Sequence, residues 1–205
     1  MAGRIHDPLV GAHILTGIVL GTGTALLYQV GLLWNQGVRL SAVVGAPAVT
    51  ALLGGRHIIQ QLVFYLDDAI SKAMLALFLI FLLRLIVRQG LVAGVLCVTI
   101  LTFAAISWTP PGGTEVGSRD AVPAVIIGTG AALLIFVLTR SGLLSTVTAI
   151  LTLSILTEFP ITADLSSWYF GTAIAGILAV LGLMAYSYHV AVAGRTWIGH
   201  LLSRE

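Results

Sequence analysis

The chain has 205 residues, of which 58% are hydrophobic and only 9% are charged, and its mean hydropathy is +1.06. A soluble domain carries roughly 25% charged residues, so this composition cannot supply a water-exposed surface. Ten Lys and Arg residues against eight Asp and Glu residues give a formal charge of +2 without any basic cluster, which excludes a nucleic-acid partner.

Long apolar runs recur along the whole chain, many of them near the roughly 20 residues with which a helix spans a bilayer. They are too continuous for the alternating strands of a barrel, and a helix satisfies its own backbone hydrogen bonds in lipid. The sequence therefore predicts one all-α transmembrane domain over residues 1–205, a polytopic integral membrane helical bundle of about six spans. The expected spans are 9–34, 69–87, 91–108, 121–139, 143–157 and 168–193.

Residues 35–68 contain no apolar stretch long enough to cross the membrane. Two short apolar pieces are interrupted by polar residues, namely Asn35, Arg39, Arg56, His57, Gln60, Gln61, Asp67 and Asp68. A single crossing over 40–66 would place Arg56 at mid-membrane and raise the count to seven spans, so an interfacial or re-entrant segment is preferred. Asp67 and Asp68 then directly precede a helix, which favours a cap of its positive N-terminal end over a cation site.

The orientation follows from the basic residues. With six spans, one side receives Arg4, Arg84, Arg88, Arg140, Arg195 and Arg204, and the other receives Arg39, Arg56, Lys72 and Arg119. The positive-inside rule then predicts a multi-pass protein of a bacterial inner (cytoplasmic) membrane with both termini in the cytoplasm. Expected anchors at the membrane interfaces are Trp34, Arg84, Arg88, Trp108, Trp168, Tyr169 and Arg195.

Small residues and two histidines are the remaining candidate site residues. Gly17 and Gly21 are four residues apart and predict close helix packing, as do Gly128 and Gly171 in later spans. His13 and His189 lie within spans, where a neutral imidazole could bind a metal or contact a tetrapyrrole or pigment. No partner motif accompanies them, so a hydrogen-bonded structural histidine is the favoured interpretation, and the sequence requires no cofactor or metal.

Motifs for catalysis are absent. The sequence contains neither His-Glu-x-x-His nor a Gly-x-Ser-x-Gly elbow, and we expect no enzymatic activity. The lone Cys97 lies within an apolar run, where it most simply acts as a small hydrophobic residue.

Several segments resemble a known membrane region. They are Arg-Ile-His-Asp-Pro-Leu-Val-Gly at 4–11, residues 75–88 ending in Phe-Leu-Leu-Arg-Leu-Ile-Val-Arg, Asp-Leu-Ser-Ser-Trp-Tyr at 164–169 and Ala-Gly-Arg at 193–195. They are similar to the multi-spanning region that occurs alone or fused behind bacterial serine/threonine kinase domains. This chain has no kinase motifs, so the resemblance implies a membrane anchor or sensor module with a cytoplasmic amino terminus.

The leading prediction is a non-catalytic membrane subunit. It would lie in the lipid bilayer and pack against other membrane protein subunits in a larger complex of the respiratory or photosynthetic type. A small transporter or channel is the alternative, working through residues such as Asp67, Arg84, Glu158 and Asp164. The anchor or sensor module is a third possibility.

Overall fold

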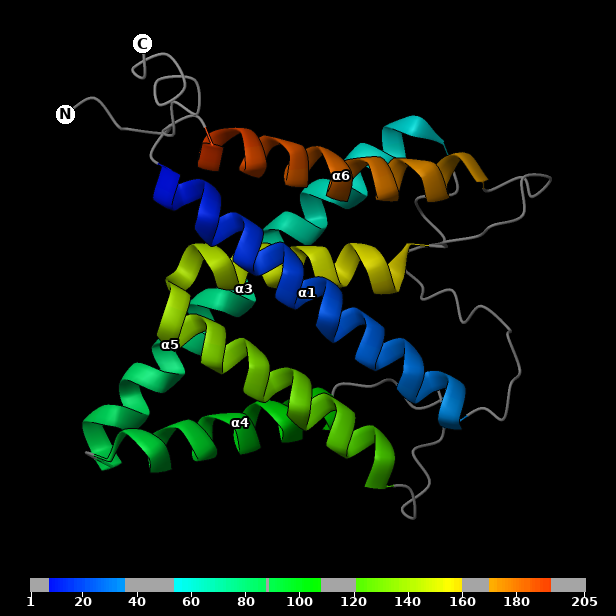
Figure 1. Cartoon of the computed structure of the whole chain (residues 1–205). Coiled ribbons are helices and arrows are strands. Elements are labelled where there is room, and N and C mark those ends of the chain that lie inside the picture. Colours follow the sequence, from blue (N-terminus) through cyan, green and yellow to red (C-terminus); the bar gives the residue numbers. More distant parts are fainter. Residues whose placement is uncertain (1–7, 36–53, 88, 108–120, 160–169, 193–205) are drawn as a thin grey trace, which may run out of the picture.

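In the computed structural model the chain is all-α (Figure 1). The structure describes residues 8–35, 54–87, 89–107, 121–159 and 170–192. These residues form five helices, namely α1 (Pro8–Asn35), α3 (Gly55–Val87), α4 (Gly90–Ser107), α5 (Ala121–Glu158) and α6 (Phe170–Val192). The all-α prediction is thus confirmed.

Four of the described helices are long and apolar enough to cross a membrane: Pro8–Val30 in α1, Gly55–Val87, Val125–Glu158 in α5, and Phe170–Val192. The apolar part of α4 is shorter, Val92–Ala104. By length and composition the chain is a multi-pass membrane protein, but the prediction of six spans is wrong. Spans 121–139 and 143–157 are joined in α5, which is broken at Gly142, and among the described residues the apolar part of α4 is too short to count as a span.

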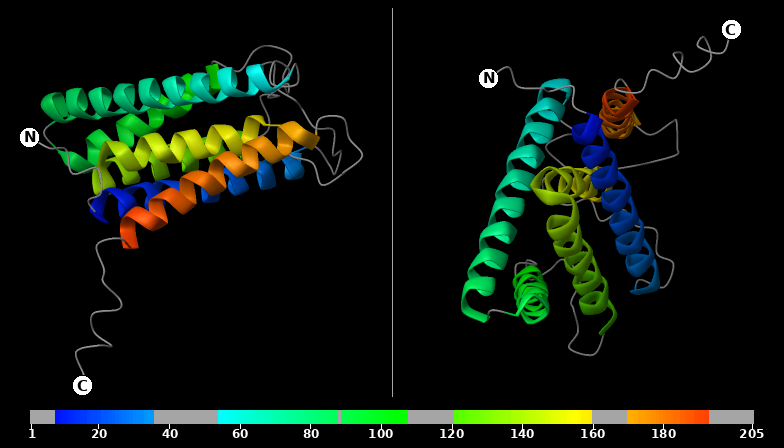
Figure 2. Two further views of the ribbon diagram at one scale, coloured as in Figure 1. Left: turned by 90° about the horizontal axis from the view of Figure 1, so that it is seen from above. Right: turned by 60° about the vertical axis from the view of Figure 1, so that its left-hand side comes forward.

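Helix α5 is broken at one residue. Gly142 has φ 85° and ψ −176°, a backbone conformation open almost only to glycine, because a side chain would collide with the backbone there. From this corner a first arm (residues 121–141) and a return arm (residues 143–158) run toward the same side of the molecule (Figures 1 and 2). The turn predicted at residues 140–142 is therefore the place where the helix breaks.

Helix α3 begins earlier than predicted. Its 33 residues correspond to about 50 Å, more than the hydrocarbon core of a bilayer. Residues 55–68 continue directly into the predicted span, so the interfacial prediction is wrong for that part, while residues 36–53 lie outside the described residues. Asp67 and Asp68 are inside the helix, so the cap prediction is also wrong. The Asp68 carboxylate instead pairs with Lys72 Nζ one turn later, at 2.6 Å.

Helix α1 packs against both arms of α5. Gly17 and Gly21 face the return arm, whereas Thr24 lies beside Gly130 of the first arm. One core cluster joins α1, α3, α5 and α6 through Ile14, Ile18, Tyr65, Ile155, Phe159 and Val180. A second joins α3 and α4 to the first arm through Ala76, Ile80, Cys97, Ile135 and Leu138.

The outer surface of the described helices is apolar. Large side chains such as Phe81 (66% exposed), Leu85 (70%) and Phe103 (72%) point away from the bundle. Such a surface would aggregate in water, because burying it there is strongly favourable. It is the surface that hydrocarbon chains solvate.

Candidate functional site

The side chain of His13 turns toward the corner of α5. Its Nδ1–H donates to the Ser141 carbonyl oxygen at 2.5 Å, and the Ser145 hydroxyl donates to the His13 carbonyl oxygen at 2.8 Å. The break at Gly142 leaves carbonyl groups at the end of the first arm without their usual helical donors. His13 satisfies one of them, which is a structural role.

His189 lies elsewhere on the molecule. It is exposed in the last turn of α6, whereas His13 is half-buried against α5. Within the described parts of the chain, no group of three or more His, Cys, Asp or Glu side chains could hold a metal ion. The cofactor-binding prediction for the two histidines therefore stays a prediction.

The predicted packing glycines differ in their surroundings. A Cβ at Gly21 would lie 2.5 Å from the Ala149 carbonyl oxygen, and a Cβ at Gly17 would lie 2.5 Å from that of Ser145. Gly128 has only ordinary contacts, with Thr102 at 3.6 Å, and Gly171 has no neighbour within 4 Å of its Cβ position.

Gly11 is a close-packing position that the sequence analysis did not select. Its Cβ position lies 2.6 Å from the Ser187 carbonyl oxygen and still closer to the Ala191 nitrogen, so α1 and α6 meet backbone to backbone. No signal pointed to it, because it lies off the four-residue step that links Gly17 to Gly21.

Of the predicted interface anchors, two lie in described helices. Arg84 is exposed in the last turn of α3, and Trp34 is in the last turn of α1. Five lie outside the described residues, namely Arg88, Trp108, Trp168, Tyr169 and Arg195.

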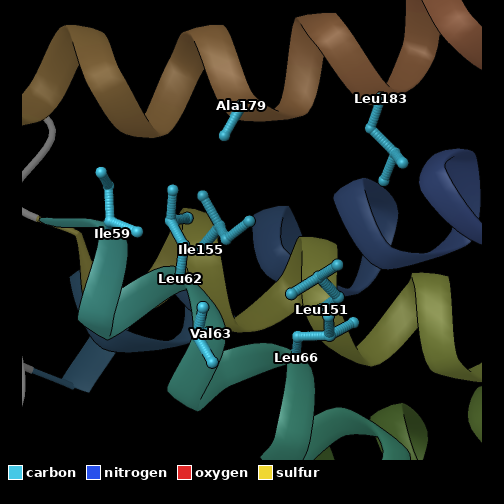
Figure 3. Close-up of a pocket in the computed structure, with 8 residues that line it drawn as sticks. All are labelled: Ile59, Leu62, Val63, Leu66, Leu151, Ile155, Ala179 and Leu183. Atoms are coloured by element: carbon cyan, nitrogen blue, oxygen red, sulfur yellow. The ribbon is translucent and has the colours of Figure 1, made fainter.

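An apolar groove opens between α3 and α6. It has a volume of about 280 Å³, and the return arm of α5 forms its floor (Figure 3). The lining residues are Ile59, Leu62, Val63, Leu66, Leu151, Ile155, Ala179 and Leu183. In Figure 3 Ala179 and Leu183 extend from α6 toward side chains that rise from α3 and α5. Every side chain that lines the groove is therefore a hydrocarbon.

Polar groups gather beside this groove, at the end of the return arm. Tyr65 is only 1% exposed, and its hydroxyl lies beside the side chains of Gln61 and Glu158. Its ring lies 5.8 Å from that of Phe159, the residue after Glu158. The Glu158 carboxylate interacts electrostatically with Tyr65, Asp68 and Lys72. Side chains of α3 and α5 thus form a polar cluster in an apolar bundle.

The charges in this cluster do not balance. Lys72 is paired with Asp68, and Glu158 makes no ion pair with any described residue. The Glu158 carboxylate is half-buried beside the Tyr65 phenol, and the Lys72 ammonium lies near enough to attract it.

The sequence analysis found only part of this cluster. It assigned Glu158 to a polar loop and did not select Tyr65. A signal was present: Gln61, Tyr65, Asp68 and Lys72 recur at helical spacing, which places them along one side of α3. That pattern is visible only when residues 55–87 are treated as one helix.

Comparison of the chain with protein-family models, with curated proteins and with solved structures finds no match. The resemblance to the kinase-associated membrane region therefore rests on the quoted segments alone.

Proposed function

We propose that the chain is a non-catalytic subunit that packs against other membrane polypeptides in a larger membrane complex. The observation that carries the proposal is the outer face of α6, defined by Gly171, Ile174, Leu178 and Gly182. These residues follow helical spacing, and Ile174 and Leu178 are 38% and 60% exposed. Among the described residues, nothing lies within 4 Å of the Cβ position of either glycine.

This face has the features of a helix–helix contact in lipid. Hydrocarbon solvates apolar side chains as well as another helix does, so association depends on close packing at small residues. The opposite side of α6 is already used: Gly176 lies against the Phe159 ring, and Ser187 and Ala191 lie against Gly11. No described helix packs on the glycines of the outer face, which suits it to a contact with a further helix.

The orientation proposed with this function is that both termini face the cytoplasm of a bacterial inner membrane. The contact of Gly11 with Ala191 brings the start of α1 to the end of α6. This contact supports a common side for both ends of the chain, and the basic residues supply the choice of side.

The test is to extract the tagged chain from its native membranes in a mild detergent, size the complex and identify co-migrating proteins by mass spectrometry. Gly182→Leu should reduce co-purification of the partner about tenfold, because a bulky side chain separates the helices. Gly23→Leu is the matched control, since nothing lies within 4 Å of Gly23 either, but it belongs to α1. Purification of the native chain as a lone, stable monomer would contradict the proposal.

Transport is the second candidate function. It is favoured by the carboxylate of Glu158 in the polar cluster and by the broken helix α5, since transporters bind substrates at discontinuous helices. The substitution Glu158→Gln should then abolish the flux of the transported solute into proteoliposomes that contain the purified chain. An unchanged flux would remove this candidate.

A further inference from the structure

We propose that the groove between α3 and α6 binds one acyl chain of an anionic phospholipid, whose phosphate is held by Arg56 just beyond the end of the groove. The acyl chain is argued from the side chains that line the groove, and the headgroup from the position of Arg56. The proposal does not depend on a partner subunit, so it stands or falls separately from the proposed function.

The lining of the groove selects a hydrocarbon chain. All eight lining side chains are hydrocarbon, so a polar ligand would lose its hydrogen bonds to water without replacing them. On α3 the lining runs from Ile59 to Leu66, which is about 10 Å along the helix axis. Ile59, Val63 and Leu66 are exposed although they line the groove, so its outer side opens toward the hydrocarbon of the bilayer. An acyl chain therefore enters the groove without crossing water.

The size of the groove favours a single chain over a helix. Its volume is about 280 Å³, whereas a helix about 10 Å across would occupy roughly 800 Å³ over the same length. Leu151 and Ile155 of the return arm close the groove from below, which limits its depth (Figure 3). A helix of a partner or of a second copy would rest on the rim of the groove, while a narrow, flexible chain lies inside it.

Arg56 sets the charge of the headgroup. It precedes Ile59 by three residues and Val63 by seven, so it lies on the same face of α3 as the groove lining, one turn closer to the start of the helix. Arg56 is exposed and makes no ion pair with a described residue. A guanidinium matches a phosphate group through two parallel hydrogen bonds. A lipid whose acyl chain leaves the groove at Ile59 thus brings its phosphate within reach of Arg56.

The length of α3 places Arg56 at the depth of lipid headgroups. Arg56 and Arg84 lie near the two ends of α3 and are separated by about 42 Å along the helix axis. A bilayer is about 40 to 45 Å thick when both headgroup regions are included. Each arginine therefore lies among headgroups, and the groove that begins one turn from Arg56 lies among the acyl chains of the adjacent leaflet.

Other amphiphiles fit these observations less well. A cationic amphiphile would be repelled by Arg56, and the lining of the groove contains no carboxylate to hold it. A zwitterionic lipid offers the same acyl chain, but its ammonium group offsets the attraction of its phosphate to Arg56. The anionic phospholipid is the class that uses both the hydrocarbon lining and the guanidinium.

The experiment is native mass spectrometry of the purified full chain, which is delipidated in a non-ionic detergent and titrated with phosphatidylglycerol or with phosphatidylcholine of the same acyl chains. We expect one phosphatidylglycerol to bind before any other, about fivefold more tightly than phosphatidylcholine. Equal affinities for the two lipids, or many equivalent lipids without a first site, would overturn the proposal. A chain that retains a second copy of itself in place of the lipid would also overturn it.

Two pairs of variants locate the lipid. Arg56→Gln should abolish the preference for phosphatidylglycerol, whereas Arg84→Gln, at the opposite end of α3, should retain it. Ala179→Phe fills the groove and should abolish the first site for both lipids. Leu181→Phe is its control, because it adds the same ring to an exposed position of α6 outside the lining, and it should leave binding unchanged.

Each variant is first compared with the native chain by its thermal melting temperature. A folded Ala179→Phe protein that still binds one lipid tightly would overturn the assignment of the acyl chain to the groove. A folded Arg56→Gln protein that still prefers phosphatidylglycerol would overturn the assignment of the headgroup. Arg56 is exposed, so its substitution should not impair folding, and it keeps the proposal testable if Ala179→Phe fails to fold.

Discussion

Replacing Gly21 with alanine should destabilise the contact between α1 and the return arm of α5. The new Cβ would lie 2.5 Å from the Ala149 carbonyl oxygen and 3.0 Å from its Cα. Both are backbone atoms, so no side-chain rotation relieves the overlap. Reaching an ordinary 3.4 Å contact requires the helices to separate by about 0.9 Å, which forfeits a large part of their dispersion attraction. Overpacking of this kind costs about 1 to 3 kcal/mol.

The control for this prediction is Gly23→Ala, two residues along the same helix, where nothing lies within 4 Å of the Cβ position. Alanine favours the helix over glycine by about 0.5 to 1 kcal/mol at both positions, so this gain cancels in the comparison. Reversible unfolding in mixed detergent and SDS micelles should show Gly21→Ala less stable than Gly23→Ala by about 1 to 3 kcal/mol. Equal stability of the two variants would refute the close packing of α1 on α5.

Three further predictions concern the corner of α5 and the core. Gly142→Ala should lower the free energy of unfolding by about 1 to 3 kcal/mol through local backbone strain, since no other described residue lies within 4 Å of its Cβ position; an unchanged stability would contradict the break. Ser145→Ala should cost about 1 kcal/mol, because the His13 carbonyl oxygen loses the Ser145 hydroxyl. His13→Ala should also cost about 1 kcal/mol, because the Ser141 carbonyl oxygen keeps only the longer contact of 3.3 Å with the Ser145 hydroxyl. SDS titration measures both, and two neutral substitutions would count against these bonds. Cys97 is 0% exposed, so a maleimide should label it only after unfolding, and rapid labelling of the folded chain would disprove its burial.

The sequence alone determined the solvent and the class of the protein. Apolar length is a local, additive property, so α1 and α6 begin and end within two residues of the predicted spans 9–34 and 168–193. The glycine that breaks α5 was also visible, because a turn that needs positive φ selects glycine over other residues.

Tertiary structure decided what composition could not. Residues 55–68 contain enough polar side chains to suggest a surface segment, yet they are helical because Ile58, Leu62 and Tyr65 pack on α5 and α6. The surroundings of Glu158 likewise depend on which helix meets the end of α5, and α3 supplies Tyr65 and Lys72 there. Such contacts join positions far apart in the chain, and hydrophobic periodicity carries no record of which faces meet.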